Sequence, residues 1–382
     1  MAQASLRPHE PPASARGALG LPMAREPRRL RLCFIGCGRI ARRHASGIKR
    51  ECSGLIDVVA FVDTHLPRAE DQARFCGASG CKVFSSVGEA LAWGEFDAVD
   101  IMVLHHQHEE VALQCFQARK HVLLEKPMAP TLEACERMLA ASEASGRVFM
   151  VAEQSQYFGF AMAVQQLVAS GAIGRVISAK AAWHWQLGPS NPDIKLLEGE
   201  AGTKPWRFVK SIMGGGIAID GGAHFLRPLR MVVPGDIESV SAVLAWPYEP
   251  MEGESLALAL VRFTSGAVGS FEAVCTGPWR SSVSFLRVLG SRGEIVADAD
   301  GEVRLFTEEH PEGERVPYEV QHPHGMLLRD FANAVLHGVP PAATAADSLG
   351  ELRAALAMYR SQESGAWEHV WDGSPSLGRA KL

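Results

Sequence analysis

The sequence predicts two consecutive folded parts: an α/β domain with a parallel sheet, and an α+β domain with a large, open, mostly antiparallel sheet. From about residue 30 to residue 150, short apolar strands alternate with helical segments. Parallel strands need such crossover helices, which cover both faces of the sheet. In the second part, strand-like runs follow one another with glycine-containing turns between them, a pattern typical of antiparallel pairing.

The first strand ends in a glycine-rich turn. An apolar run leads into Gly-x-Gly-x-x-Ala at residues 36–41, and a helix-compatible segment follows. Gly36 permits the tight turn, Gly38 lets the backbone approach a pyrophosphate, and Ala41 allows close packing of helix on strand. The N-terminus of that helix offers free N–H groups to phosphates. We therefore expect a Rossmann dinucleotide-binding turn rather than an ordinary glycine turn, with Arg39 and Ile40 also contacting the cofactor.

An acidic residue ends the second predicted strand. Asp63 follows the apolar run 58–62 and lies about 25 residues after Gly38, where a carboxylate binds the hydroxyls of the adenosine ribose. A carboxylate there repels a 2′-phosphate, so Asp63 favours NAD over NADP. Arg68 and the arginines after Ala41 keep NADP possible. The alternative is that Asp63 only forms the turn at the end of the strand.

The remaining elements of the first part bring further polar residues to the same place. Expected helices span residues 42–50, 66–76, 87–93 and 109–119, and expected strands span 82–84, 97–104 and 121–124. Ligands of such sheets bind beyond the carboxyl ends of the strands. That edge would carry the glycine-rich turn, Asp63, the segment His105–His108 and the tripeptide Glu125–Pro127.

Lys126 lies at a strand end immediately before Pro127. Proline disfavours helix at the preceding residue, so the lysine is held at a corner of the chain. A lysine there can hydrogen-bond a substrate hydroxyl and stabilise the alkoxide that develops as hydride leaves. The alternative is a solvated surface lysine.

A second glycine-rich turn, Gly214–Gly216, leads into a predicted helix that carries Asp220 and His224. Residues four apart share one helical face. A carboxylate beside an imidazole can orient the ring and support its protonated form, as general acid–base catalysis requires. The alternatives are a surface pair or a helix cap.

Composition sets the outer limits. A chain of 382 residues is long enough for two domains, and its net charge of −5 gives no support for nucleic-acid binding. We find no apolar run that could span a membrane. Eight scattered cysteines predict reduced core thiols in an intracellular, cytoplasmic protein. Residues 1–29 predict a disordered extension; the alternatives are a start-site artefact, with Met23 as the true start, and an organelle-targeting peptide, which their arginine content favours.

In this order, the motifs resemble the Gfo/Idh/MocA family, named for glucose-fructose oxidoreductase and inositol dehydrogenase. The resemblance covers about residues 30–372. Its matching pieces are Gly36–Ala41 with His44, then His108, Arg119–Ala129, Ile173–Ile177, Trp206-Arg207, Gly214–Gly216, Asp220, His224, and Gly338–Pro341 with Thr344 and Asp347. Expected boundaries are residues 1–29 for the extension, 30–150 for the NAD(P)-binding Rossmann domain and 151–382 for the substrate and oligomerisation domain.

The resemblance implies a two-domain oxidoreductase with Lys126, Asp220 and His224 as its catalytic set. His224 would take the hydroxyl proton as hydride leaves, Lys126 would polarise the same oxygen, and Asp220 would orient or charge-compensate His224. The implied cofactor residues also include His105, His108, Glu125 and Lys126. The implied substrate residues are Lys126, Trp206, Arg207, Asp220 and His224. It further implies that the open sheet pairs with another subunit, giving a homodimer or homotetramer.

Some residues depart from the family pattern. Arg227 stands where many members carry an acid, residues 104–107 replace a Thr-Pro-type turn, and residues 154–157 replace an arginine. Arg227 and Arg230 would either contact an acidic substrate or cover a surface helix. His105, His106 and His108 lack carboxylate or cysteine partners at fixed spacing, so we expect no metal site.

We therefore expect an NAD-preferring dehydrogenase, with NADP possible, that acts on a secondary hydroxyl of a cyclic polyol, sugar or related alcohol. One alternative is a glycosidase that uses bound NAD for transient oxidation. Another is a sensor or regulator that binds NAD without turnover. The intact set of Lys126, Asp220 and His224 argues against the regulator but does not separate the two enzymes.

Overall fold

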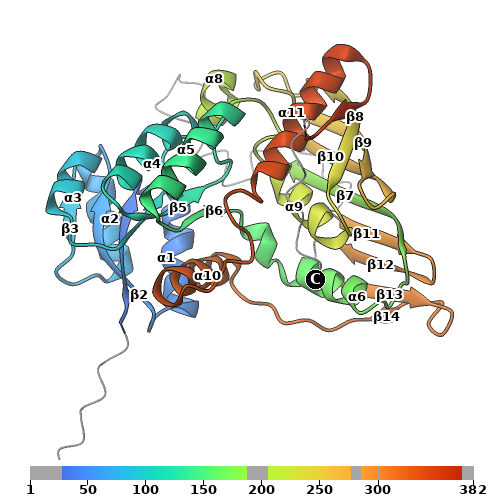
Figure 1. Ribbon diagram of the computed structural model, residues 1–382, viewed down its shortest axis with the longest axis horizontal. Helices are drawn as coiled ribbons and strands as arrows, with labels where there is room; N and C mark the ends of the chain where they lie inside the picture. Colours follow the sequence, from blue (N-terminus) through green and yellow to red (C-terminus); the bar gives the residue numbers. More distant parts are fainter. Residues whose placement is uncertain (1–27, 187–204, 277–284, 299–300, 372–382) are drawn as a thin grey trace, which may run out of the picture.

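A computed structural model describes residues 28–186, 205–276, 285–298 and 301–371. The extension expected for residues 1–29 lies outside this part of the chain, apart from Arg28 and Arg29. Figure 1 shows two sheets side by side, each with its own helices.

Within the described residues, the first sheet has six parallel strands in the order β3-β2-β1-β4-β5-β6. These are β1 (Leu30–Ile35), β2 (Ile56–Val62), β3 (Lys82–Phe84), β4 (Ala98–Ile101), β5 (His121–Glu125) and β6 (Phe149–Ala152). The crossover helices are α1 (Arg39–Glu51), α2 (Leu66–Cys76), α3 (Val87–Trp93), α4 (His108–Gln117) and α5 (Leu132–Ser145). The order reverses between β1 and β4, which confirms the Rossmann fold and places its ligand crevice there.

The second sheet is mixed and mostly antiparallel, as predicted. Within the described residues it has nine strands in the order β14-β13-β12-β11-β7-β10-β9-β8-β15. They are β7 (Val176–Gln186), β8 (Ile237–Ala245), β9 (Leu256–Phe263), β10 (Val268–Thr276), β11 (Phe285–Gly290), β12 (Gly293–Asp298), β13 (Val303–Thr307), β14 (Glu314–Arg315) and β15 (Glu368–His369). Strands β7 and β10 pair in parallel, and the other recorded pairs are antiparallel.

Helices cover one face of this sheet. Helix α6 (Gly159–Ala169) packs against β12, α9 (Ala223–Val232) against β7, and α11 (Leu349–Ser364) against β8. The side chains of Val240, Val261 and Phe271 point to the covered face and are buried. The short helix α8 (Lys210–Met213) precedes the glycine-rich turn that leads to α9.

Helix α10 (Pro323–His337) returns from the second sheet to the first domain. Its residues Leu327, Leu328 and Phe331 are buried in one apolar cluster with β1. It crosses α1 closely, since a side chain on Gly47 would come within 2.6 Å of the Gly325 backbone nitrogen. The expected boundary after residue 150 falls inside β6, which belongs to the first sheet and ends at Ala152, whereas the second sheet begins with β7 at Val176. Through α10, the later part of the chain contributes to both domains.

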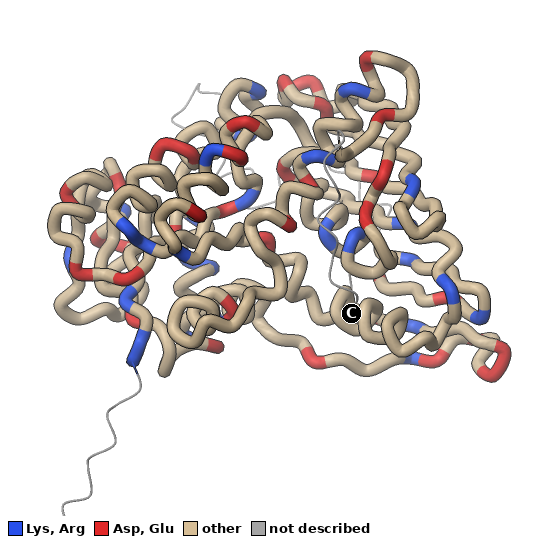
Figure 2. Tube along the Cα trace, in the orientation of Figure 1, with Lys and Arg blue, Asp and Glu red and all other residues tan. Residues whose placement is uncertain are grey.

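Charged residues of both signs are spread over both domains (Figure 2). Among the described residues, the helices are all too short or too polar to cross a membrane.

Candidate active site

The glycine-rich turn after β1 has the geometry that a dinucleotide requires. Gly36 has φ +91°, and a Cβ there would lie 2.5 Å from the carbonyl oxygen of Met102 on the neighbouring strand connection. A Cβ on Gly38 would meet nothing within 4 Å, so the surface above it is open to a ligand. Helix α1 begins at Arg39 without a side-chain cap, which leaves first-turn N–H groups for phosphate.

Asp63 follows β2 directly and holds this turn. Its Oδ2 accepts a hydrogen bond from the Cys37 backbone N–H at 2.9 Å, and its Oδ1 accepts one from the His65 N–H at 2.9 Å. Each carboxylate oxygen keeps a further acceptor position for a ribose hydroxyl. The turn and Asp63 therefore fit the adenosine half of NAD.

Lys126, which directly follows β5, reaches across to the second domain. Its ammonium group donates to Asp220 Oδ1 at 2.9 Å and to the Asp220 backbone oxygen at 3.0 Å. Arg207 Nη1 donates to the other carboxylate oxygen at 2.6 Å. Burial by itself raises the pKa of the Asp220 carboxyl, but the charges of Arg207 and Lys126 outweigh it and hold the pKa well below its usual range.

His224 lies in the first turn of α9, and its carboxylate partner is Glu153 rather than Asp220. Its Nδ1 donates to Glu153 Oε1 at 2.8 Å. Although burial raises the pKa of Glu153, the charge and hydrogen bond of His224 and the charge of Lys126 lower it to about 2. The Gln154 amide lies 3.4 Å from the other ring nitrogen of His224.

The expected pairing of Asp220 with His224 fails for a local reason. Helix α9 begins only at Ala223, so Asp220 lies in the preceding turn and the two residues do not share a helical face. Asp220 instead faces the first domain. Sequence reasoning did not single out Glu153, although it directly follows β6 at the carboxyl edge of the first sheet, where ligands bind.

His108 and Glu125, two residues predicted to bind the cofactor, contact the chain next to Lys126 and stabilise its conformation. His108 is fully buried, with Nδ1 3.0 Å from the Pro127 carbonyl oxygen and Nε2 3.2 Å from that of Val103. Glu125 Oε1 accepts a hydrogen bond from His44 Nε2 at 3.0 Å. Their side chains therefore fix the chain around the peptide bond between Lys126 and Pro127, which is cis.

His44 forms a buried ion cluster with two carboxylates. Its Nδ1 donates to Asp100 Oδ2 at 2.7 Å, opposite the bond to Glu125. Burial lowers the pKa of His44, but the two carboxylates raise it to about 10, so the ring is an imidazolium ion at neutral pH. In the sequence, His44 stands only among the motif residues of the family, with no predicted chemical role.

Aromatic side chains surround the polar centre. The Trp206 ring meets His105 edge-on at 5.0 Å, and the Arg207 guanidinium lies over Trp206 at 4.5 Å. His105 is buried, and burial lowers its pKa to about 3, so its ring is neutral. Trp183 on β7 approaches the His224 ring at 6.5 Å. The residues predicted as the catalytic and substrate sets thus lie around one junction of the two domains.

Sequence profiles of known families match both domains. One, described as an oxidoreductase family with an NAD-binding Rossmann fold, matches residues 30–153. Another, the GFO/IDH/MocA C-terminal domain, matches residues 161–296. The chain belongs to the Gfo/Idh/MocA family. Membership confirms three predictions: the family, the oxidoreductase class and NAD as the cofactor.

Relatives in the Gfo/Idh/MocA family span nearly the same length. The chain is 28% identical over 345 residues to 1,5-anhydro-D-fructose reductase of Ensifer adhaerens, which covers 89% of this chain and 98% of the relative. It is 24% identical over 348 residues to myo-inositol 2-dehydrogenase of Thermotoga maritima, covering 87% and 96%. The solved structure of levoglucosan dehydrogenase with NADH and levoglucosan shares the fold, with TM-score 0.77, 23% identity, and coverage of 90% and 100%.

The departure of this Gfo/Idh/MocA member at Arg227 has a structural explanation. Arg227 and Arg230 are buried on the inner face of α9 and form ion pairs with Glu351 and Asp347 of the α11 region. Arg230 also pairs with Asp236 at 2.8 Å. Both expectations for these arginines, substrate contact and surface cover, are therefore wrong, because the charges are neutralised inside the domain.

Proposed function

We propose that the protein is an NAD-dependent dehydrogenase for a secondary hydroxyl of a sugar, polyol or related cyclic alcohol, working in either direction. The observation that carries this proposal is the pair formed by Lys126 and His224. They come from different domains, each is held by its own buried carboxylate, and both lie at the carboxyl edge of the Rossmann sheet. The names of the relatives, which include sugar and inositol oxidoreductases, support the same substrate class.

His224 is arranged to exchange a proton with the substrate hydroxyl. Since the ionised Glu153 accepts a hydrogen bond from the Nδ1–H group, the neutral ring has its lone pair at Nε2. When Nε2 takes the hydroxyl proton, the negative charge of Glu153 stabilises the resulting imidazolium ion. In the direction of reduction, the same ring returns the proton.

Lys126 is arranged to stabilise negative charge on the same substrate oxygen. Two of its three N–H bonds point to Asp220, so the ammonium group is fixed and one N–H remains for the substrate oxygen. Arg207 on the far oxygen of Asp220 keeps that carboxylate ionised, so that it can hold the Lys126 ammonium group in place. Bound NAD supplies the hydride acceptor.

Trp183 and Trp206 provide apolar surface on two sides of this centre. A cyclic alcohol presents apolar C–H faces between its hydroxyl groups, and aromatic rings pack well against such faces. The glycosidase alternative is not favoured, because the relatives are named dehydrogenases and reductases.

The experiment is a substrate screen with purified protein and NAD or NADP against a panel of sugars, anhydro-sugars and inositols. We expect the absorbance of reduced nicotinamide to appear with NAD and at least one panel member, and Lys126→Ala to abolish most of it. Cofactor binding without turnover on any member would contradict the proposal and favour a regulator. Release of free sugar from a glycoside without net NAD reduction would favour the glycosidase.

We also propose that a second copy of the chain covers the open face of the second sheet, giving a homodimer or homotetramer. The strand register places five apolar side chains on this face, each 41% to 61% exposed: Val243, Leu258, Leu260, Val268 and Leu289. Alternating exposed apolar residues across neighbouring strands form a patch that is unusual on a monomer. If two copies of the chain pack together across a twofold axis, the same patch is buried on both copies.

A further inference from the structure

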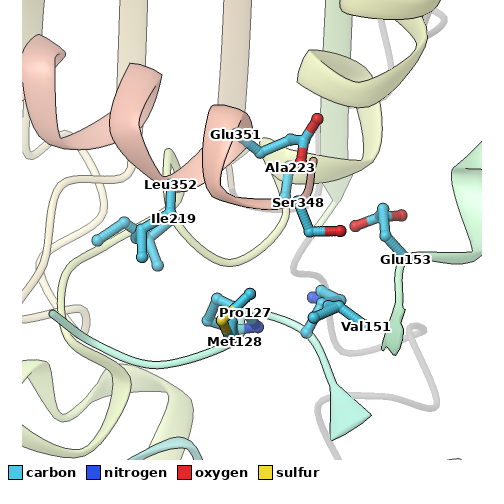
Figure 3. Close-up of a pocket in the computed structure, with 10 residues that line it drawn as sticks. Pro127, Met128, Val151, Glu153, Ile219, Ala223, Ser348, Glu351 and Leu352 are labelled. Atoms are coloured by element: carbon cyan, nitrogen blue, oxygen red, sulfur yellow. The ribbon is translucent and has the colours of Figure 1, made fainter. Parts of the chain in front are cut away.

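A small cavity lies behind the Lys126–Pro127 corner. Its volume is about 20 Å³, and its lining includes Lys126, Glu153, Ser348 and Glu351. Figure 3 shows the Glu153 carboxylate and the Ser348 hydroxyl pointing toward each other across this space. A cavity of this size has room for one water molecule, provided that several polar groups line it.

Glu153, which lines this cavity, has one carboxylate oxygen that the described residues leave without a recorded partner. Its Oε1 accepts from His224 Nδ1 at 2.8 Å and from the Ser155 backbone N–H at 3.0 Å. Its Oε2 is buried and has no recorded hydrogen-bond partner among the described residues. The neighbouring Ser155 hydroxyl is also without a recorded partner, and it contributes to lowering the pKa of Glu153. A buried ionised carboxylate with one unsolvated oxygen is costly, so a donor at Oε2 is strongly favoured.

Ser348 connects the far side of the cavity to a buried positive charge. Its hydroxyl accepts from Arg227 Nη2 at 3.0 Å, and its only other recorded contact among the described residues is at 3.3 Å, with the Thr344 carbonyl oxygen. A water molecule between the two side chains would donate one hydrogen to Glu153 Oε2 and the other to Ser348 Oγ. The positive charge of Arg227 would then stabilise the negative charge of Glu153 through a chain of hydrogen bonds that passes through Ser348 and the water.

We propose that Glu153 is the positioning residue of His224, and that one buried water molecule held by Ser348 completes its hydrogen bonds. The carboxylate keeps the proton on Nδ1 and turns Nε2 toward the substrate, while the water keeps the carboxylate ionised. This gives a role to Arg227, whose charge stabilises the far end of the chain of hydrogen bonds. This inference rests on the proposed function in one respect, the role of His224 as the catalytic acid and base.

Three other titratable groups face Glu153 and His224, and none of the variants described below changes them. Lys126 approaches from β5, Glu351 lines the cavity from α11, and His324 approaches from α10. Burial and the charge of His44 lower the pKa of His324 to about 2, so it stays neutral. Glu351 is tied to Arg227 and Arg230. Changes at Glu153 and Ser348 therefore act on His224 against a constant background.

The two variants shift the protonation of His224 in opposite directions. Glu153→Gln keeps the shape but removes the negative charge, so the imidazolium ion is less stable and the pKa of His224 falls. Ser348→Ala removes one support of the water, so the isolated carboxylate is less stable and protonation of His224, which neutralises it, is favoured. We expect its pKa to rise by about half to one pH unit in Ser348→Ala and to fall by about one unit or more in Glu153→Gln.

The first readout needs no turnover. The full-length, cofactor-free protein is labelled with nitrogen-15 histidine, and the ring signals of His224, assigned by their loss in His224→Gln, are titrated by NMR. Ser361→Ala is the matched control, because Ser361 on α11 is buried and hydrogen-bonded like Ser348 but does not line the cavity. Shifts of the same sign in both variants, or an equal shift in Ser361→Ala, would overturn the proposal.

The second readout is structural. A crystal structure of the cofactor-free protein should show one ordered water within about 3.2 Å of both Glu153 Oε2 and Ser348 Oγ. The same water should be missing or displaced in Ser348→Ala. A dry cavity, or a direct partner for Glu153 Oε2, would refute the inference. Because neither readout uses a substrate, their outcome is independent of the substrate screen.

Discussion

Replacing His44 by glutamine should destabilise the first domain strongly although the residue touches no predicted substrate group. The imidazolium ion is fully buried and is the hydrogen-bond donor to both Asp100 and Glu125. A pKa raised from 6.5 to about 10 corresponds to an upper limit of roughly 5 kcal/mol of stabilisation. Removing one partner of a buried ion pair typically costs about 3–5 kcal/mol. We therefore expect a loss of about 3–5 kcal/mol for His44→Gln at pH 6.

The same cluster gives the wild type a defined pH dependence. A folded-state pKa above the unfolded value means that the stabilisation is complete below pH 6.5 and is lost as the pH rises toward 10. Urea unfolding, followed by circular dichroism at several pH values and constant ionic strength, measures both effects. His106→Gln serves as the control, since it removes an exposed histidine from the adjoining segment.

The reasoning about His44 fails in either of two cases. One is a His44→Gln variant within about 1 kcal/mol of the wild type at pH 6, which would mean that the two carboxylates do not depend on the ring. The other is a variant that keeps the full decline in stability between pH 6.5 and pH 10. Because two-domain proteins need not unfold in one step, a curve with two transitions is fitted as two steps, and the effect is read from the transition that His44→Gln shifts.

Three further predictions concern the cofactor and the assembly. Asp63→Ser should narrow the preference for NAD over NADP in a binding titration, because it removes the charge that repels a 2′-phosphate; a native preference for NADP would contradict the assignment. Gly38→Val should weaken NAD binding by at least about tenfold without lowering the melting temperature, since its side chain enters open space, whereas Gly36→Val should destabilise the fold; unchanged NAD affinity in Gly38→Val would refute the placement of the pyrophosphate. Leu260→Asp should shift the oligomer toward monomer in light scattering, with Val320→Asp as an exposed control outside the sheet; a native monomer at micromolar concentration would reject the interface.

The elements of the fold could be predicted because their signals are local. The glycine-rich turn, the apolar strands and the helical segments of the first domain are each encoded within about a dozen residues. The pairing of β7 with β10 and the return of α10 to the first domain could not be predicted in the same way. Both features bring together segments that are far apart in the chain. They are stabilised by packing between those segments, which no local pattern of apolar residues indicates.

The candidate site also contains residues that local motifs predict and contacts that only the tertiary structure determines. Lys126, Asp220 and His224 could be found because each stands in a short motif, and the order of those motifs resembles a family. Their partners could not, since Lys126 and Asp220 are 94 residues apart and Glu153 and His224 are 71 apart. Which carboxylate meets which base depends on how the two domains meet.

The central claim is that Lys126 and His224 act on the same substrate oxygen, and a double-mutant cycle tests it most directly. With the best substrate of the screen, Lys126→Ala should cost about 2–4 kcal/mol in kcat/KM, and His224→Ala should lower turnover by about 10²–10⁴-fold. NAD affinity should change little in either variant, because neither residue belongs to the glycine-rich turn that binds the pyrophosphate. Since both groups stabilise charge at one atom, the double variant should lose clearly less than the sum of the single losses. Fully additive losses, or near-native turnover in His224→Ala, would contradict the account.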